Sequence, residues 1–393
     1  MLQGHVHPDF AAVAATFGTF LRDRPGGGAA CVWHRGEKMV DIWGGAADRE
    51  GRPWLEDTTA PSFSTTKGVV STLLHVLADE GRVHYDDPVG RHWPEFGQAG
   101  KEHITVRHLL THEAGLYRIG EMVSSPQDML DWSIMTAAVA AAKPVHTPGE
   151  QHGYHALTYG WLIGGLIEKI TGEPLATTLQ QRLAEPLALD GLFIGMPDEE
   201  VSRRAHLVNG MLRRPQPKEG WQTGVADAVR RALRYVGVDL AEFRAALFPF
   251  DTPFDFNSEE VVRACIPAAN GQFTARSLAR LYAMIAEGGA LEGVRLLSPA
   301  RVQLMGEVRN RTRDNVLFIP MHWRLGYHRV FAFGARAPQG FGHFGYGGSG
   351  AFCDPSRRLA VALTVNGGTG TPTGDSRMPR LAGAAIRCAD RNG

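Results

Sequence analysis

A serine and a lysine lie three residues apart in the segment Pro61-Ser62-Phe63-Ser64-Thr65-Thr66-Lys67-Gly68, and no other serine of the chain has a lysine at this spacing. The apolar periodicity that follows predicts a helix over residues 65–80. Positions i and i+3 of a helix share a face, so we expect the Lys67 amine to reach the Ser64 hydroxyl at the helix N-terminus. A nucleophile beside a base suits acyl transfer through a serine ester, although two fixed positions alone also fit an exposed helix start.

Composition narrows the classes of partner. The chain has 393 residues with 41 basic and 41 acidic side chains, so its net charge is zero. This balance disfavours nucleic acid and anionic membranes and favours a small neutral or mixed molecule. No apolar run is long enough to predict a membrane span, and the N-terminus lacks the pattern of a secretion signal, so we expect a cytoplasmic enzyme. The sequence leaves the oligomeric state open.

The cysteine and histidine spacings do not predict a metal site. Neither a zinc motif nor a disulfide framework can be derived from the cysteines, and free thiols are expected. His152 and His155 have no carboxylate or third ligand at metal spacing. We therefore expect an enzyme without a metal or other cofactor. The four cysteines are Cys31, Cys265, Cys353 and Cys388.

Strands are predicted near both ends of the chain and helices mainly between them. The predicted strands are 29–34, 39–43, 350–354 and 359–366. Apart from the helix after Ser64, the predicted helices are 10–21, 106–110, 128–142, 157–171, 174–183, 275–287 and 381–391.

This order of elements predicts an α+β fold, in which an antiparallel sheet flanked by helices is built from both termini and a mainly helical domain is inserted. We expect an α/β domain at 1–60 plus 265–393 and a helical domain at 61–197 that carries the nucleophile, with a cleft between them. Residues 198–264 are predicted to form an insertion. A lid over the cleft and a surface excursion fit this insertion equally well.

Further landmarks follow the Ser64 motif in order: Asp86-Asp87-Pro88-Val89, Leu109-Leu110-Thr111-His112-Glu113-Ala114-Gly115-Leu116, and Pro148-Gly149 ahead of Tyr154. This ordered set resembles the serine β-lactamase and penicillin-binding-protein superfamily. More narrowly, the chain resembles family VIII carboxylesterases, the esterase branch related to class C β-lactamases. The resemblance runs from about residue 29 to residue 365 and implies a β-lactamase/D,D-peptidase-like fold with the active site between its two parts.

The superfamily's second motif, Y-x-N or Y-x-S, corresponds here to Tyr154-His155-Ala156. A lysine ammonium favours ionisation of a neighbouring phenol, so Tyr154 and Lys67 are expected to share one proton and together to deprotonate Ser64 and activate water. Ala156 lacks the amide that would bind a substrate carbonyl, which weakens the expectation of β-lactam recognition. Tyr159 is the rival tyrosine, but it falls inside an apolar helix and is expected to belong to the core.

The third motif, K-T-G, is replaced by His343-Phe344-Gly345, followed by Tyr346. By the superfamily pattern, the backbone N–H groups of Ser64 and Tyr346 would form the oxyanion hole. A histidine is mostly neutral near pH 7, whereas a lysine offers a permanent cation to a substrate carboxylate, so neutral esters are favoured over anionic β-lactams. A purely structural role for His343 is the alternative.

Substrate contacts are predicted from the same loop and from aromatic residues. His343, Phe344 and Gly345 are expected to border the substrate, and Tyr117 and Phe63 are candidates for the wall of an acyl pocket. We predict a serine hydrolase that cleaves carboxylic esters of short to medium acyl chains through an acyl-enzyme on Ser64. The alternatives are a β-lactamase or D,D-peptidase, an acyltransferase using the same serine, and a non-catalytic binding protein on this fold.

Overall fold

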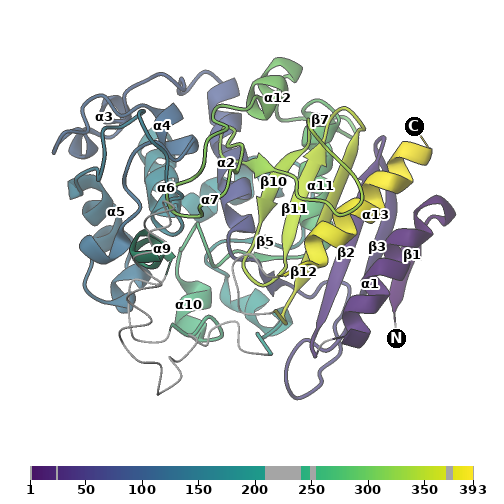
Figure 1. Ribbon diagram of the computed structural model, residues 1–393. Coiled ribbons are helices and arrows are strands. Elements are labelled where there is room, and N and C mark those ends of the chain that lie inside the picture. The colour runs from purple at the N-terminus through teal and green to yellow at the C-terminus, as the bar shows by residue number, and fades with distance from the viewer. Residues whose placement is uncertain (1, 24, 209–239, 248–253, 369–374, 393) are drawn as a thin grey trace, which may run out of the picture.

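The computed structural model describes residues 2–23, 25–208, 240–247, 254–368 and 375–392. Strands from the two ends of the chain meet in one antiparallel sheet (Figure 1). These strands are β1 (Gln3–Val6), β2 (Gly27–His34), β3 (Glu37–Gly45), β9 (His328–Arg329), β10 (Phe341–Phe344), β11 (Gly350–Asp354) and β12 (Leu359–Val365). Their order across the sheet is β1-β3-β2-β12-β11-β10-β9, which confirms an α+β fold built from both termini.

The pairing of β2 with β12 joins the N-terminal and C-terminal halves of the sheet, with Val32 opposite Val361. Side chains of a strand alternate between its two faces. In β12 the large residues Leu359, Val361 and Leu363 point to one face, and the intervening positions Ala360 and Ala362 point to the other. Strand β12 therefore presents bulky residues to one face of the sheet and small residues to the other.

The bulky face is covered by the two terminal helices, α1 (Ala11–Asp23) and α13 (Arg377–Arg391), which lie side by side in Figure 1. The small face is covered by α11 (Ala275–Ala286), which packs on β2, β11 and β12. Helix α2 (Thr65–Asp79) lies next to it against β10. Alanine at Ala360 and Ala362 leaves room for α11 to approach the sheet closely.

The remaining helices between α2 and α11 gather on the side of the molecule away from α1 and α13 (Figure 1). Most of them pack around α6, whose apolar side chains belong to the same core as α2. They are α3 (Val89–His92), α4 (Val106–Leu110), α5 (Trp132–Ala141), α6 (Thr158–Thr171), α7 (Leu175–Leu179), α9 (Leu240–Leu247) and α10 (Glu259–Arg263), and α12 (Pro299–Gly306) follows α11.

Some elements differ from the sequence-based expectation. The predicted helix at 128–142 is divided because Asp131 has extended backbone angles and its side chain accepts a hydrogen bond from the Ile134 N–H, which starts α5 anew. The predicted helix at 174–183 is α7 followed by a π-helical turn at Gln180–Ala184. Strand β1 was not predicted, since its pairing with β3 is a tertiary contact without a local pattern.

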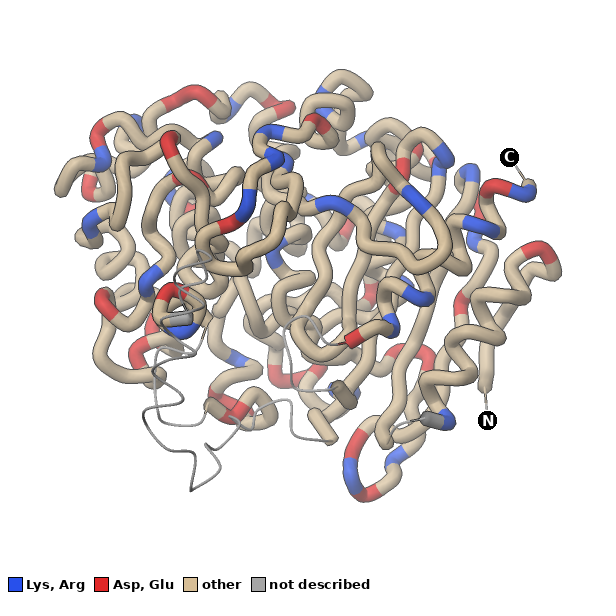
Figure 2. Tube along the Cα trace, in the orientation of Figure 1, with Lys and Arg blue, Asp and Glu red and all other residues tan. Residues whose placement is uncertain are grey.

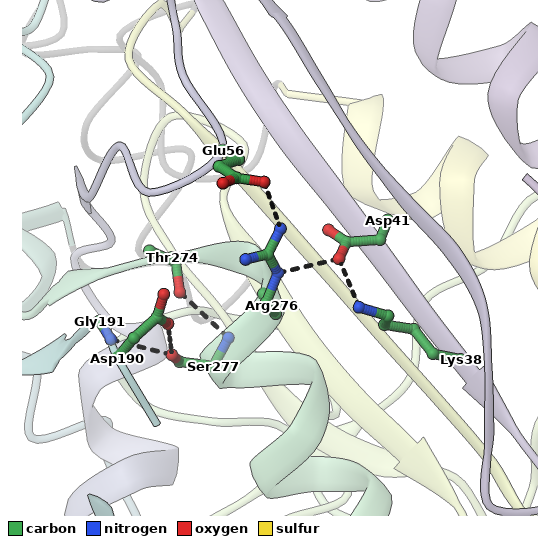
Figure 3. A network of polar contacts seen from close by, with 8 residues as sticks. All are labelled: Lys38, Asp41, Glu56, Asp190, Gly191, Thr274, Arg276 and Ser277. Atoms are coloured by element: carbon green, nitrogen blue, oxygen red, sulfur yellow. Dashed lines mark hydrogen bonds and ion pairs between the residues drawn. The ribbon is translucent and has the colours of Figure 1, made fainter. Parts of the chain in front are cut away.

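Polar side chains at the start of α11 tie this helix to the neighbouring parts of the chain (Figure 3). The Arg276 guanidinium pairs with Asp41 on β3, at 2.8 Å, and with Glu56. Next to it, the Ser277 hydroxyl donates to Asp190 at 2.9 Å. A short sheet, β4 (Ala60–Pro61), β6 (Gln272–Phe273) and β5 (Leu192–Phe193), also joins the strands before α2 and before α11. These contacts fix α11 relative to α2.

The predicted insertion is described only in part. Helix α9 contacts the turn at Ile119–Glu121, and Arg118 forms an ion pair with Glu242 of α9. Further along, Phe256 packs on Phe63 with ring centroids 5.0 Å apart. Residues 209–239 and 248–253 of the predicted insertion lie outside the described residues. The boundaries at 60, 197 and 264 stay a prediction.

Acidic and basic residues are both spread over the described chain (Figure 2). This distribution accords with the zero net charge. Among the described helices, none combines the length and the apolar character needed to cross a membrane.

Candidate active site

Ser64 is the residue immediately before α2, and its side chain does not cap the helix. A serine at this position ordinarily accepts a hydrogen bond from a backbone N–H of the first turn. Here the Ser64 Oγ instead accepts from Lys67 Nζ at 3.2 Å and from the Tyr154 hydroxyl at 2.8 Å. The structure thus brings the three predicted residues together, with Ser64 half-buried and the other two buried.

Lys67 lies one turn into α2, as the i, i+3 spacing predicted, and is fully buried. Its Nζ donates a second hydrogen bond to the Ala268 carbonyl at 2.9 Å. Burial lowers the pKa of the Lys67 amine well below its usual range, because an ammonium loses its hydration there. A neutral amine at this position has a lone pair that can accept the Ser64 proton.

Tyr154 precedes α6, and its ring lies 5.0 Å from Lys67 Nζ. Burial raises the pKa of the Tyr154 hydroxyl, and the hydrogen bond to Ser64 only partly offsets this. Burial thus opposes ionisation of this phenol, and the expectation that Tyr154 and Lys67 share one proton stays a prediction. Burial of both groups favours the neutral amine with the neutral phenol over the ammonium with the phenolate, although either pair carries the same single shared proton.

The backbone around Tyr154 is fixed by groups that sequence reasoning did not assign to the site. The Asp314 carboxylate accepts from the Tyr154 backbone N–H at 3.1 Å and from the Trp323 indole N–H at 2.9 Å. Trp323 in turn stacks on the Tyr154 ring, with centroids 5.5 Å apart and planes 12° apart. On the other side, His112 Nδ1 accepts from the His155 N–H at 3.2 Å. Asp314 belongs to no recognised motif, so spacing gave no signal for it.

His343 lies on β10 on the same side of the sheet as Lys67 and Tyr154. Its ring centroid is 6.2 Å from that of Tyr154, and its side chain is buried. Burial, with smaller contributions from His328 and Lys67, lowers the pKa of His343 well below its usual range. The ring is therefore neutral, as expected, and its Nε2 has no hydrogen-bond partner among the described atoms.

The chain on either side of Ser64 lies directly against the segment after β10. A Cβ added at Gly345 would come within 2.3 Å of the Ser62 carbonyl oxygen, so only glycine fits there. Phe63 has a left-handed backbone with φ of 46°, a conformation that costs about 1–3 kcal/mol in a non-glycine residue. Its ring packs edge-on against Tyr346, with centroids 5.6 Å apart. Gly345 and Tyr346 are half-buried, as Ser64 is, so this side of the site is open to solvent.

Phe344 is not brought together with the other site residues. It follows His343 in β10, so its side chain points to the opposite face of the sheet, where it packs near Phe352 and Met378. Tyr117 lies on the Tyr154 side of the site and packs in one apolar cluster with Tyr154, Trp323 and Ala246 of α9. The alternation of β10 therefore separates Phe344 from Tyr117, although both were expected to contact the substrate.

Other polar residues near the site occupy structural positions. Tyr159 is fully buried in α6 and its hydroxyl shares a hydrogen bond with Ser71 at 2.7 Å, which confirms its assignment to the core. Ser349 is buried and accepts from the Val365 N–H at 3.1 Å. His155 accepts from the Leu116 N–H at 2.9 Å. Within the described part of the chain, no group of three or more His, Cys, Asp or Glu side chains is arranged to hold a metal ion.

The chain is similar to known proteins over nearly its whole length. The model of the Beta-lactamase family matches residues 13–386. The esterase/beta-lactamase LipL of Mycobacterium tuberculosis is 39% identical over 371 residues, which cover 92% of this chain and 82% of that protein. A penicillin-binding protein homolog from Caulobacter crescentus has a TM-score of 0.85 at 36% identity, covering 99% of this chain and 100% of that one. A family VIII carboxylesterase has a TM-score of 0.83 at 32% identity, with the same coverage. The expected resemblance is confirmed, and the chain belongs to the beta-lactamase family.

Proposed function

We propose that the protein is a carboxylesterase that forms an acyl-enzyme on Ser64. The observation that carries this proposal is the half-buried Ser64 Oγ, which is contacted both by the Lys67 amine and by the Tyr154 phenol. The lowered pKa of the Lys67 amine supports its role as the general base. A serine without such a base is a weak nucleophile, so the contact with Lys67 is the main support for catalysis.

In the acylation step, Ser64 Oγ attacks the ester carbonyl carbon while its proton passes to Lys67 Nζ. Tyr154 donates its hydroxyl proton to the departing alkoxide as the bond from the carbonyl carbon to the ester oxygen breaks, and it recovers a proton from Lys67. Water then attacks the acyl-enzyme in the reverse sense, giving its proton to this pair and releasing Ser64 and the carboxylic acid. One shared proton between Lys67 and Tyr154 serves both half-reactions.

The backbone N–H groups of Ser64 and Tyr346 are proposed as the oxyanion hole. The close approach of Gly345 to Ser62 supports this assignment, because it holds the two backbone segments beside each other. The N-terminus of α2 adds a favourable field for the negative charge. Removal of one oxyanion donor typically costs about 2.7–4 kcal/mol of transition-state stabilisation.

Neutral esters of short to medium acyl chains are the proposed substrates. The neutral, buried His343 offers no cation for a substrate carboxylate, and Ala156 offers no amide for a substrate carbonyl. Phe63 and Tyr117 are proposed to border the acyl and alcohol groups. Both contact described parts of the insertion, Phe256 and α9 respectively, which supports a role for the insertion in shaping the pocket.

The test is a paired assay of the wild type and Ser64→Ala on p-nitrophenyl acetate and butyrate and on a chromogenic cephalosporin. We expect rapid ester hydrolysis by the wild type, little cephalosporin turnover, and loss of both hydrolysis and fluorophosphonate labelling in Ser64→Ala. Circular dichroism of the variant controls for folding. Labelling at another serine, or ester hydrolysis retained by the variant, would refute the assignment.

A β-lactamase activity is the second candidate, because the relative LipL is named as both an esterase and a β-lactamase. Cephalosporin turnover that exceeds ester turnover in the same assay would favour it. Product analysis in the presence of an added alcohol separates acyl transfer from hydrolysis. A wild type that turns over neither substrate class and is not labelled would favour a binding function.

A further inference from the structure

Asp314 is a buried carboxylate next to the proposed active site that the acyl-transfer scheme does not use. Its side chain has no exposed surface. Oδ1 accepts from the backbone N–H groups of Tyr154, Val316 and Leu317 at 3.1, 2.8 and 2.8 Å, and Oδ2 accepts from the indole N–H of Trp323 at 2.9 Å. All of these partners are uncharged donors.

The set of partners fits an ionised carboxylate. Burial raises the pKa of Asp314, and the hydrogen bonds from Leu317, Trp323, Val316 and Tyr154 act in the opposite direction. A protonated carboxyl would place a donor among these donors, whereas the ionised form accepts from each of them. Burying a charge is costly, so a carboxylate retained here calls for a role that an apolar residue could not fill.

The contacts of Asp314 reach the Tyr154 hydroxyl by two routes. One hydrogen bond holds the Tyr154 backbone, and the other orients Trp323, whose ring stacks on that of Tyr154 at 5.5 Å. The far edge of Trp323 packs against His112, with centroids 4.3 Å apart, and His112 accepts from the N–H of the residue after Tyr154. The tyrosine is thereby held at its backbone and on its ring face.

We propose that Asp314 is a positioning residue for the reaction, which fixes the Tyr154 hydroxyl at hydrogen-bond distance from Ser64 through the Tyr154 backbone and the Trp323 ring. This inference rests on the proposed function of Ser64 and Tyr154. It adds a residue that lies in no motif of the chain and comes from the loop before β9, far from Tyr154 in sequence. Asp314 itself does not touch Ser64 or the reacting atoms.

The test uses Asp314→Asn, Trp323→Phe and the double variant in the full chain. In Asp314→Asn, the new amide directs its own N–H groups either toward the Trp323 N–H, which loses that one contact, or toward the backbone N–H groups, which loses those three. We expect kcat on p-nitrophenyl butyrate to fall by about 10- to 100-fold with KM changed by less than about threefold, because a displacement near 1 Å costs about that much. In a protein that already carries Trp323→Phe, we expect Asp314→Asn to lower kcat by a clearly smaller factor than it does in the wild type.

Asp354→Asn is the matched control, since Asp354 is a buried carboxylate that accepts from Ser356 and Arg357 in the turn after β11. It should lower the midpoint of thermal unfolding but leave kcat near the wild-type value. Equal losses of kcat in both Asn variants, or kcat within twofold of wild type in Asp314→Asn, would overturn the proposal. If Asp314→Asn does not fold, the Trp323→Phe variant tests the proposal instead. We expect this variant to have a lower kcat and an unchanged KM. Failure of the proposed function would be seen in a different experiment, because Ser64→Ala would then hydrolyse p-nitrophenyl butyrate as fast as the wild type does.

Discussion

The two faces of the main sheet bury different kinds of side chain. The face under α1 and α13 is filled by aliphatic and aromatic residues such as Val361, Leu363 and Phe352. On the other face, β10 and α2 bury the polar groups of Lys67 and His343 next to small strand residues. Apolar burial stabilises the fold, whereas a buried amine or imidazole is costly and is kept neutral. The face under α1 and α13 therefore contributes apolar burial alone, whereas the other face combines apolar burial with the polar groups that supply the chemistry.

Strand β10 shows this division within two residues. His343 faces the proposed site, and Phe344 faces the apolar side. A change on one face should leave the property of the other face intact. Substitutions on each face test this expectation, because activity and stability can be measured separately for each variant.

The largest effect is expected for Lys67→Met on the polar face. Methionine has a similar shape but no basic nitrogen, so kcat/KM should fall by about 10²- to 10⁴-fold, the range of general-base catalysis. Stability should not fall in parallel, because the cost of burying the amine disappears. Ester hydrolysis and thermal unfolding measured on the same preparation check both expectations. A variant that loses stability as steeply as activity would contradict the division between the faces.

The next effect is expected for Leu363→Ala on the apolar face. Leu363 is fully buried in the cluster with α1 and α13, and its truncation should cost about 2–5 kcal/mol of the free energy of unfolding. Urea denaturation measures this loss. At a temperature where the variant is folded, kcat on esters should stay within about twofold of the wild type, by the additivity expected of distant sites. A larger fall in kcat would mean that the sheet transmits the change to β10.

The smallest effect is the pH dependence of stability that comes from Lys67. Its pKa is lowered in the folded protein, so between that lowered value and the usual pKa the unfolded chain binds a proton that the folded chain does not. Stability therefore rises with pH in this window, by at most about 1.4 kcal/mol per pH unit. We expect the wild type to gain stability relative to Lys67→Met between two pH values on the alkaline side of neutrality. If the free energy of unfolding changed equally with pH in the wild type and in Lys67→Met, Lys67 would be charged in the folded protein.

Much of the fold follows from local patterns. The strands at 350–354 and 359–366, the helix after Ser64 and the helix at 106–110 were all predicted within a residue or two of their observed bounds, because alternation and helical periodicity are local properties. The break at Asp131 was missed because a capping side chain competes with helix continuation inside an apolar run. Strand β1 was missed because pairing with β3 forms it.

The candidate site divides in the same way. The spacing of Ser64 and Lys67 already placed the amine within reach of the hydroxyl, since one helical turn separates them. The motif order located Tyr154 and His343. The alternation of side chains along β10 could be anticipated from the sequence. Which face of β10 is turned toward Ser64 could not, so Phe344 was expected on the wrong side.

The sequence by itself determined most of the elements, the Ser64 and Lys67 pair and the family, because these depend on spacing along the chain. Only the tertiary structure decided the direction in which the pKa values of Lys67 and Tyr154 shift, which depends on how completely their neighbours exclude water. It also decided the contact of Asp314 with Tyr154, across a separation of 160 residues in the sequence. Burial and long-range hydrogen bonds arise when distant segments pack, and no local pattern encodes them.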